Sequence, residues 1–421
     1  MSRRSFMVTA MAGLLAMATT VGAGAQGTAP ETDVDFELRV GALAGLTGDL
    51  AVSGQPWSEA VRIAAEDIQA RLDGMGLGDR ITVTFVGAED SQGNQTGGIE
   101  AATKLVQADE VDVVVGDFFS SVTIAAAQSV LIPNGVLDFT GGTNAAISTL
   151  EDDGLVWRPV ASDALQGRLV AQLLADRFGA DATVNVGFRN DAYGAGLTEV
   201  FREAWTAGGG TIGAEVGFDE GAATLDTEAQ ALVAGDPDAW FIVAFCGDWG
   251  KLKGPLQRTG AWDPARTHSA DALSNCEGPD ALVEGMTGTE GTSTAGTSFP
   301  AYEGLYKEKA SAGTEFQQFT TQAFDSVYLA FLGALAAGSS TPSDIAAQLQ
   351  SVSGAPGAQF TFEQLEDAII AVLGGEDIDF EGTTGPIDFD ENGDITVNIY
   401  RLWQVDADGE QVTQEEVTFT P

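Results

Sequence analysis

Two hydroxyl side chains, Ser120 and Ser121, end the stretch VVVGDFFSS, which begins at Val113, and the apolar stretch 122–131 follows them. The β-branched run before Gly116 predicts a buried strand, and the later stretch predicts a helix. Hydroxyls at the start of a helix can cap its free N–H groups or donate hydrogen bonds to a ligand carboxylate. The residues alone leave both interpretations open. No Lys or Arg is near in sequence, which argues against a ligand with two or more negative charges.

Catalytic and metal chemistry find little support in the rest of the chain. The single histidine, His268, excludes most Ser/His/Asp and Cys/His sites and most zinc sites. The stretch DFDENGD at 388–394 resembles the start of a calcium loop, but Ile399 stands where a bidentate Glu is required. We therefore expect no enzyme activity, no metal and no cofactor. The 62 acidic residues keep a hydrolase with two catalytic carboxylates as an alternative.

The N-terminus has the features of an export signal. Arg3 and Arg4 precede a moderately apolar stretch, and Ala25 ends a small-residue cleavage site. We therefore predict a signal peptide at 1–25, a flexible leader at 26–35 and a periplasmic location. The two arginines also fit a twin-arginine signal, so both export routes stay open. No later segment is long and apolar enough to predict a membrane span.

The acidic composition indicates which partners the chain avoids. With 62 acidic and 19 basic residues the net charge is −43, and such a field repels nucleic acid and anionic lipid. The chain is 44% apolar, which is enough to bury a core. A folded, lysine-poor, acidic surface suits a salty medium, where screening removes self-repulsion. Because export is predicted, the two cysteines, Cys246 and Cys276, predict a disulfide.

Strands and helices alternate along the chain in two series. Strands are predicted at 36–43, 81–87, 111–115, 136–139, 183–188, 211–218, 239–245 and 266–270, and helices at 55–72, 95–108, 122–131, 165–178, 194–207, 225–234, 250–259, 320–337, 342–349 and 362–373. Such alternation is typical of parallel sheets covered on both faces. The series restarts near Ser162, which predicts an α/β protein with two doubly wound lobes. The glycine-rich stretch 285–298 predicts a linker or cleft rim, and the end of the chain predicts a β-hairpin.

Several stretches resemble, in order, the leucine/isoleucine/valine-binding proteins, which are the type I periplasmic solute receptors of ABC importers. They are GALAGLTGDLAVSGQPWSEAVRIAAEDI, VVVGDFFSSVTIAAAQSVLIPNGVLDFTGGTN, VWRPVASDALQG, VGFRNDAYGAGLTEVFREAW, TTQAFDSVYLAFLGAL and TGPIDFDENGD. The resemblance implies two parallel-sheet lobes that are joined by a three-strand hinge and close over a ligand. Lobe one would comprise 36–162 plus 296–384, and lobe two 163–295 plus 385–421.

The resemblance also implies where the charged end of a zwitterionic ligand is bound. The ligand carboxylate would contact Ser120, and its ammonium would contact the carbonyl of Gly141, Thr143 and Asp271. Asp163 would be a further acid near the ligand. The residues themselves allow plainer roles: Thr143 could be a turn residue, Asp163 a helix N-cap and Asp271 a solvated acid.

Aromatic residues are the second part of the implied site. Tyr193 would close over the ligand from the second lobe, although a packed surface ring is the alternative. Phe245 stands where the family often has a tyrosine, so one hydrogen-bond donor is lost there. Trp57, Phe118 and Phe119 are either contacts for the ligand side chain or ordinary core residues. The cysteine pair, which typical members lack, would tie two cleft loops together.

The resemblance implies a receptor that binds a small amino acid, branched-chain or related, and hands it to an inner-membrane ABC permease. We expect a monomer with no enzyme activity. One alternative keeps the fold but binds urea, a short amide or an aromatic carboxylate. A second alternative is a ligand-sensing partner of a signalling protein.

Overall fold

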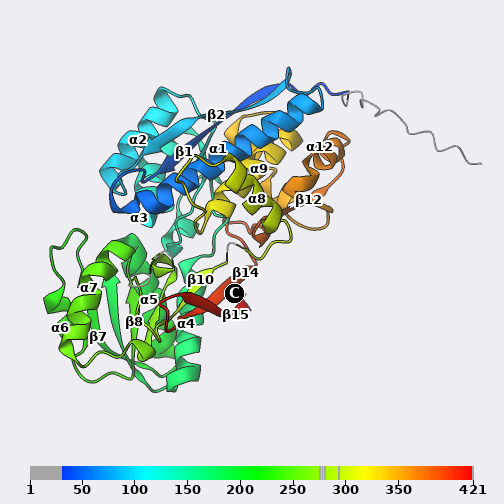
Figure 1. Cartoon of the computed structure of the whole chain (residues 1–421). Coiled ribbons are helices and arrows are strands. Elements are labelled where there is room, and N and C mark those ends of the chain that lie inside the picture. The colour runs from blue at the N-terminus through cyan, green and yellow to red at the C-terminus, as the bar shows by residue number, and fades with distance from the viewer. Residues whose placement is uncertain (1–30, 275, 277, 279–280, 293, 420–421) are drawn as a thin grey trace, which may run out of the picture.

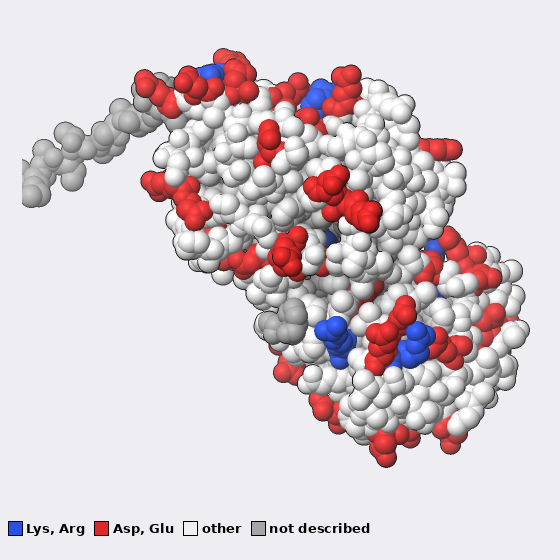
Figure 2. Space-filling model, turned by 180° about the vertical axis from the view of Figure 1, so that it is seen from behind, with Lys and Arg blue, Asp and Glu red and all other residues white. Residues whose placement is uncertain are grey.

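The computed structural model describes residues 31–274, 276, 278, 281–292 and 294–419 (Figure 1). The predicted signal peptide and the first half of the predicted leader lie outside the described residues. The chain forms two α/β lobes, one above the other in Figure 1. Acidic side chains are spread over both lobes on the face that Figure 2 shows. In the described ranges, no helix combines the length and the apolar composition that a membrane crossing requires.

The first lobe is built around a five-stranded parallel sheet in the order β2-β1-β3-β4-β5. The strands are β1 (Phe36–Ala44), β2 (Ile81–Asp90), β3 (Val113–Gly116), β4 (Leu137–Phe139) and β5 (Val156–Trp157). Strands β3 and β4 are buried along their whole length. This burial on both faces explains why these strands are near-continuous apolar runs in the sequence.

The second lobe is built around a seven-stranded mixed sheet in the order β15-β14-β10-β9-β8-β6-β7. The strands are β6 (Thr183–Arg189), β7 (Thr211–Phe218), β8 (Ala239–Val243), β9 (Thr267–Ser269), β10 (Thr287–Gly291), β14 (Asn398–Val405) and β15 (Gln411–Phe419). Strands β6 to β10 pair in parallel, whereas β14 is antiparallel to both β10 and β15. The hairpin predicted at the end of the chain is confirmed, and it makes the sheet mixed.

Helices cover the faces of both sheets (Figure 1). The first lobe contains α1 (Ala51–Gly74), α2 (Gln95–Gln107), α3 (Ser120–Ala126), α8 (Phe299–Lys309), α9 (Thr320–Ala337), α10 (Pro342–Ala346), α11 (Leu349–Ser353) and α12 (Leu365–Leu373). It also contains a small sheet of β11 (Ala358–Phe360), β12 (Ile378–Gly382) and β13 (Gly385–Pro386). The second lobe contains α4 (Asp163–Phe178), α5 (Ala192–Ala207), α6 (Asp226–Leu232) and α7 (Cys246–Thr259). Short helical segments are η1 (Gly48–Leu50), η2 (Ala127–Leu131), η3 (Ile132–Asn134), η4 (Ala145–Thr149), η5 (Pro264–Arg266), η6 (Asp271–Leu273) and η7 (Phe362–Gln364).

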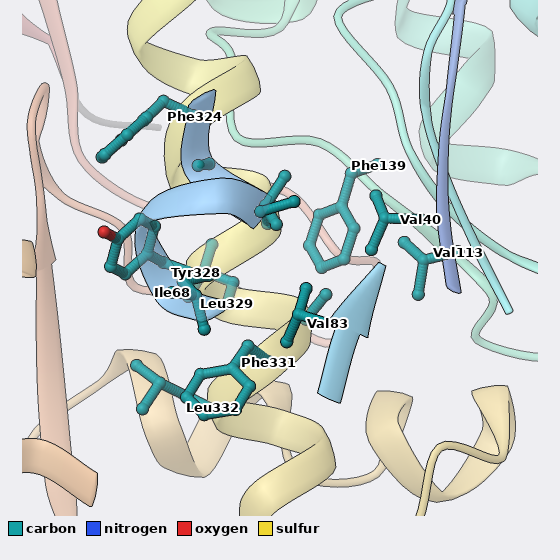
Figure 3. Close-up of a cluster of buried hydrophobic side chains, with 14 of the residues drawn as sticks. Val40, Ile68, Val83, Val113, Phe139, Phe324, Tyr328, Leu329, Phe331 and Leu332 are labelled. Atoms are coloured by element: carbon teal, nitrogen blue, oxygen red, sulfur yellow. The ribbon is translucent and has the colours of Figure 1, made fainter. Parts of the chain in front are cut away.

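The core of the first lobe joins the sheet to α1 and α9 (Figure 3). Val40, Val113 and Phe139 come from neighbouring strands, and Phe324 and Leu329 come from α9. Nearly every residue of α9 is buried, which fits a helix that is apolar on all sides. This packed layer gives the cleft loops of the first lobe a rigid base.

The predicted strands and helices are confirmed to within a few residues, whereas helix α8 and strands β5, β10, β11, β12 and β13 were not predicted. Strand β10 is the clearest omission. The stretch 285–298 is not simply a loop, because it contains β10 near the middle of the second sheet. Gly288 of β10 pairs with Trp403 of β14. A Cβ atom at Gly288 would lie 2.2 Å from the Trp403 ring, so glycine makes room for the indole. Glycine here reflects close packing rather than a turn.

The chain passes between the two lobes three times, at 158–162, 292–298 and 387–397. The first and third crossovers touch through an isolated parallel bridge between Arg158 and Asp394. The predicted α/β fold class with two doubly wound lobes is therefore confirmed. The predicted three-strand hinge corresponds to these crossovers, whose described residues contain isolated bridges rather than named strands. The residue numbers at which the lobes divide stay a prediction.

Candidate ligand-binding cleft

A cavity of about 340 Å³ lies between the lobes. Its walls are the segments that follow β1, β2, β3 and β4 in the first lobe and β6, β7, β8 and β9 in the second, together with Phe319 at the start of α9. Ligands of open α/β sheets bind at these carboxyl ends of strands. Of the predicted ligand contacts, those that line the cavity are Ser120, Gly141, Thr143, Tyr193, Phe245 and Asp271.

Ser120 is the first residue of α3 and is 2% exposed. Its Oγ accepts a hydrogen bond from the Asn144 N–H at 3.1 Å. That bond leaves the hydroxyl proton available for an anion in the cleft. The capping interpretation is wrong, because Phe119 is the N-cap residue and no side chain caps the helix.

The loop after β4 brings main chain close to the cleft. A Cβ atom at Gly141 would lie 2.6 Å from Phe118 and 2.8 Å from Trp57, so only glycine lets the loop pass these rings. Thr143 is buried at the cleft wall. Its carbonyl accepts a hydrogen bond from the Asp163 N–H at 2.8 Å, which connects this loop to the start of α4 in the second lobe.

Tyr193 and Asp271 form part of the second lobe's wall. Tyr193 lies in the first turn of α5, and Asp271 begins η6 after β9. The Tyr193 hydroxyl donates to Asp271 Oδ1 at 2.6 Å. Both side chains are buried, so the surface ring and the solvated acid considered for these positions are wrong.

Asp163 is fully buried at the start of α4 and does not itself line the cavity. The N-cap alternative is wrong, because Ser162 is the cap and its Oγ accepts from the Ala164 N–H at 3.2 Å. Neither carboxylate oxygen of Asp163 makes a hydrogen bond of normal geometry to a described residue. A buried carboxylate in this condition requires a partner or a proton.

The two buried acids, Asp163 and Asp271, both have raised pKa values. Burial and the charge of Asp271 raise the pKa of Asp163 well above its usual range, against smaller effects of the nearby Thr143 hydroxyl and Arg158. Burial also raises the pKa of Asp271, although the bond from Tyr193 opposes the rise. A ligand ammonium placed here would stabilise the ionised form of both acids.

A row of aromatic rings crosses the cleft. The ring centroids are 4.2 Å apart for Phe118 and Phe119, 5.1 Å for Phe119 and Phe245, and 5.3 Å for Phe245 and Tyr193. Phe119 belongs to the first lobe and Phe245 to the second. Trp57 lies behind Phe118, donates its Nε1–H to a carbonyl of β3 and does not line the cavity. The rings present apolar surface to a ligand side chain.

A charged group at the cleft was not predicted. Arg189 ends β6 and stacks over Phe245, with 4.9 Å from its guanidinium carbon to the ring centroid. It pairs with Glu220 at 3.0 Å and Asp248 at 3.4 Å, and Lys251 also lines the cavity. No Lys or Arg is close to Ser120 in sequence, as expected, but the fold brings Arg189 and Lys251 to the same cavity. The position of Arg189 at a strand's carboxyl end was the available signal.

The predicted disulfide is present between Cys246 and Cys276, whose Cα atoms are 5.4 Å apart. Cys246 begins α7 and lines the cavity, and Cys276 follows η6, which begins with Asp271. The bond therefore links two cleft segments of the second lobe.

The single histidine is a structural residue on β9. His268 Nδ1 is 3.0 Å from Thr287 Oγ1, and burial lowers the pKa of His268 to about 3, so the ring is neutral. Across the described ranges, no group of three or more His, Cys, Asp or Glu side chains is arranged to hold a metal ion.

Comparison with known proteins agrees with this architecture. A family model described as periplasmic binding protein matches residues 37–410. A chemotactic signal transduction system substrate-binding protein from Halobacterium salinarum is 28% identical over 281 residues, which is 65% of this chain and 65% of that protein. A Leu/Ile/Val-binding protein homologue from Brucella abortus is 26% identical over 382 residues, covering 89% of this chain and 92% of the relative.

Solved structures show the same fold at lower sequence identity. A leucine-binding protein from Thermotoga maritima has a TM-score of 0.73 at 20% identity, and the match covers 91% of this chain and 99% of that one. A solute-binding protein of an ABC transporter from R. palustris, in complex with benzoate, has a TM-score of 0.69 at 18% identity and covers 92% and 98%.

Proposed function

The chain belongs to the periplasmic binding protein family, whose members are solute-binding receptors and not enzymes, and we propose that it captures a small α-amino acid, branched-chain or related, in the cleft between its lobes. The protein would be exported and would pass the solute to an inner-membrane ABC permease. The lobes that close on the ligand would be residues 36–162 plus 296–384 and residues 163–295 plus 385–421.

The buried acids Asp163 and Asp271 are the observation that carries the proposal. Both have raised pKa values, and no ion pair to either is found among the described residues. Burying two acids close together without a direct ion pair is costly, and the nearby Arg158 offsets only part of the rise in the pKa of Asp163. The α-ammonium of an amino acid is a small cation, and its binding would offset the unfavourable free energy of these buried carboxylates.

The other end of the ligand would be bound by the Ser120 hydroxyl, which lines the cavity. The Ser120 oxygen is already held by the Asn144 N–H, so the hydroxyl can act as a donor to the ligand carboxylate. Thr143 and Gly141 line the same side of the cleft. The aromatic row that includes Phe119 and Phe245 would pack against an aliphatic side chain. Binding would stabilise the closed arrangement of the lobes.

A thermal-shift screen of the purified protein tests the proposal. L-leucine, L-isoleucine and L-valine should raise the melting temperature, because a ligand that binds only the folded state stabilises it by mass action. Leucine lacking its amino group (4-methylpentanoate) and leucinamide are matched controls that each lack one charged end. Both should give much smaller shifts. If no α-amino acid shifts the melting temperature, the amino-acid assignment fails.

A second candidate is favoured by the similarity to the Halobacterium salinarum protein, whose name assigns it to chemotactic signal transduction. The same ligand-bound lobes would then be recognised by a signalling receptor. Affinity capture with leucine-saturated protein from membranes of the source organism distinguishes the two. Recovery of a permease supports transport, and recovery of a receptor supports signalling.

An aromatic carboxylate is the other ligand that one observation favours, namely the benzoate-bound neighbour of the same fold. Benzoate lacks an ammonium, so Asp271 would have to bind it as the protonated acid. Benzoate binding that strengthens as the pH is lowered toward 5 would support this alternative. Leucine binding should weaken over the same pH change.

A further inference from the structure

A buried arginine connects the binding loop to the hinge. Arg158 follows β5 in the first crossover and is 1% exposed. Its Nη1 donates to the carbonyls of Thr143 and Asn144 at 3.1 and 2.8 Å. Thr143 lines the cleft, and the Asn144 N–H holds the Ser120 hydroxyl. The guanidinium therefore fixes the main chain that shapes the carboxylate end of the site.

The rest of the guanidinium faces the third crossover. Nε of Arg158 donates to Asp394 Oδ1 at 2.8 Å, and Nη2 is 2.6 Å from the same oxygen. Ser148 of η4 accepts from Nη2 at 2.7 Å and donates to Asp394 Oδ2 at 2.6 Å. The Arg158 N–H also donates to the carbonyl of Gly393 at 2.8 Å. One ion pair thus contacts the crossover and both ends of the loop 143–148.

The stretch DFDENGD, residues 388–394, forms the turn that places Asp394 next to Arg158. Asp390 Oδ1 accepts hydrogen bonds from the N–H groups of Asn392 at 2.8 Å and of Asp394 at 3.1 Å. Gly393 has φ +75°, and a Cβ atom there would lie 2.6 Å from the Val156 carbonyl oxygen. The turn therefore needs glycine and packs against the end of β5. Its resemblance to a calcium loop reflects this backbone geometry.

We propose that Arg158 and Asp394 are positioning residues that hold the loop 143–148 in its ligand-binding conformation and couple it to the third crossover. Ser148 bridges the pair, because it accepts from Arg158 and donates to Asp394. Since Arg158 is 1% exposed, neutralising Asp394 leaves a buried guanidinium without its ion-pair partner. Any movement of the crossover must either carry the loop with it or break the pair. This proposal rests on the proposed function only in the experiment that measures leucine affinity.

Hydrogen–deuterium exchange on the ligand-free protein tests the coupling directly. Asp394→Asn keeps the size of the side chain and removes its charge. Glu391→Gln makes the same charge change at an exposed position of the same turn and is the matched control. In Asp394→Asn, amides of 144–150 and of 387–397 should both exchange about tenfold faster, because their shared support is lost. Glu391→Gln should leave both segments unchanged.

Unchanged exchange in 144–150 in a folded Asp394→Asn variant overturns the proposal. Equal acceleration across the whole chain also overturns it, since that is general destabilisation. If Asp394→Asn does not fold, Ser148→Ala removes only the bridging hydroxyl and should accelerate the same two segments about threefold. A Ser148→Ala protein with no change in either segment then decides against the coupling.

A calorimetric titration with L-leucine adds the functional readout. Asp394→Asn should raise the leucine Kd about tenfold, and Glu391→Gln should leave it within about twofold. If the wild-type protein binds no leucine, isoleucine or valine, the proposed function fails, while the exchange experiment still decides the role of the pair.

Discussion

Replacing Asp271 by asparagine should separate ligand binding from folding. Asparagine matches the shape of aspartate and can still accept the hydrogen bond from the Tyr193 hydroxyl, now 2.6 Å from Asp271 Oδ1. The substitution therefore removes one negative charge from the proposed ammonium site with little change in packing. The perturbation acts on the feature from which the amino-acid assignment is argued.

The expected loss of affinity is large. Truncating one partner of a buried, hydrogen-bonded charge pair costs about 2–5 kcal/mol. At about 1.4 kcal/mol per tenfold change, the leucine Kd should rise by about 30-fold to a few thousandfold. Glu220→Gln is the matched control, because Glu220 also lines the cleft but is 57% exposed and should contribute little.

The same substitution should not reduce stability. Burial raises the pKa of Asp271 in the folded protein above that of the unfolded chain, so near neutral pH its ionisation disfavours folding. A neutral asparagine removes this penalty, and the ligand-free melting temperature should stay equal or rise. The measurements are calorimetric titration with L-leucine and thermal unfolding without ligand. A leucine Kd within threefold of wild type would refute the ammonium site, and a strongly lowered melting temperature would assign Asp271 a structural role instead.

Three further outcomes are expected. Asp163 and Asp271 have raised pKa values, and a bound ammonium would lower them, so leucine binding should release protons and tighten as the pH rises from about 4 toward 7. Calorimetric titrations in buffers of different ionisation enthalpy measure the number of protons released. Proton uptake on binding would contradict the prediction. Tyr193→Phe deletes the hydroxyl bonded to Asp271 and should raise the leucine Kd by about 10- to 150-fold, since a hydrogen bond to a charged group is worth about 1.5–3 kcal/mol. An unchanged Kd would count against the contact. Replacing both cysteines by serine opens a loop of 30 residues and should lower the free energy of unfolding by about 3–4 kcal/mol, as measured by denaturant titration; a loss below 1 kcal/mol would show that packing alone holds the cleft segments.

The buried strands and long helices were predictable because buried elements have a recognisable pattern of apolar residues in the sequence. Strand β3 and helix α9 are buried on all sides, so their composition alone indicates them. Strand β10 was missed because its sequence, TGTEG, is polar and rich in glycine. Its burial depends on Trp403 covering Gly288 from the neighbouring strand, and no local pattern in the sequence records that contact.

The site was predictable where each residue follows a strand. Ser120, Thr143 and Asp271 come after β3, β4 and β9, and the parallel order of the sheets brings them to one cleft. The sequence could not place Asp163 behind Thr143, because that arrangement depends on how α4 enters from the other lobe. Nor could it show that Arg189 stacks over Phe245, since Arg189 ends β6 whereas Phe245 lies between β8 and α7. The ligand roles of all these residues stay predictions.

The contacts between the lobes explain why ligand binding and closure would be a single event. Phe119 and Phe245 meet across the cleft at 5.1 Å, and the Asn144 side chain donates to the Ala192 carbonyl of the other lobe. These residues also shape the cleft: Phe119 and Phe245 line it, and Asn144 holds the Ser120 hydroxyl. A solute in the cavity would therefore touch the same residues that bring the lobes together. A ligand shifts a conformational equilibrium only by its differential affinity for the two states. In this protein that difference would arise largely from second-lobe contacts such as Tyr193 and Asp271, which an open cleft would withdraw from the solute.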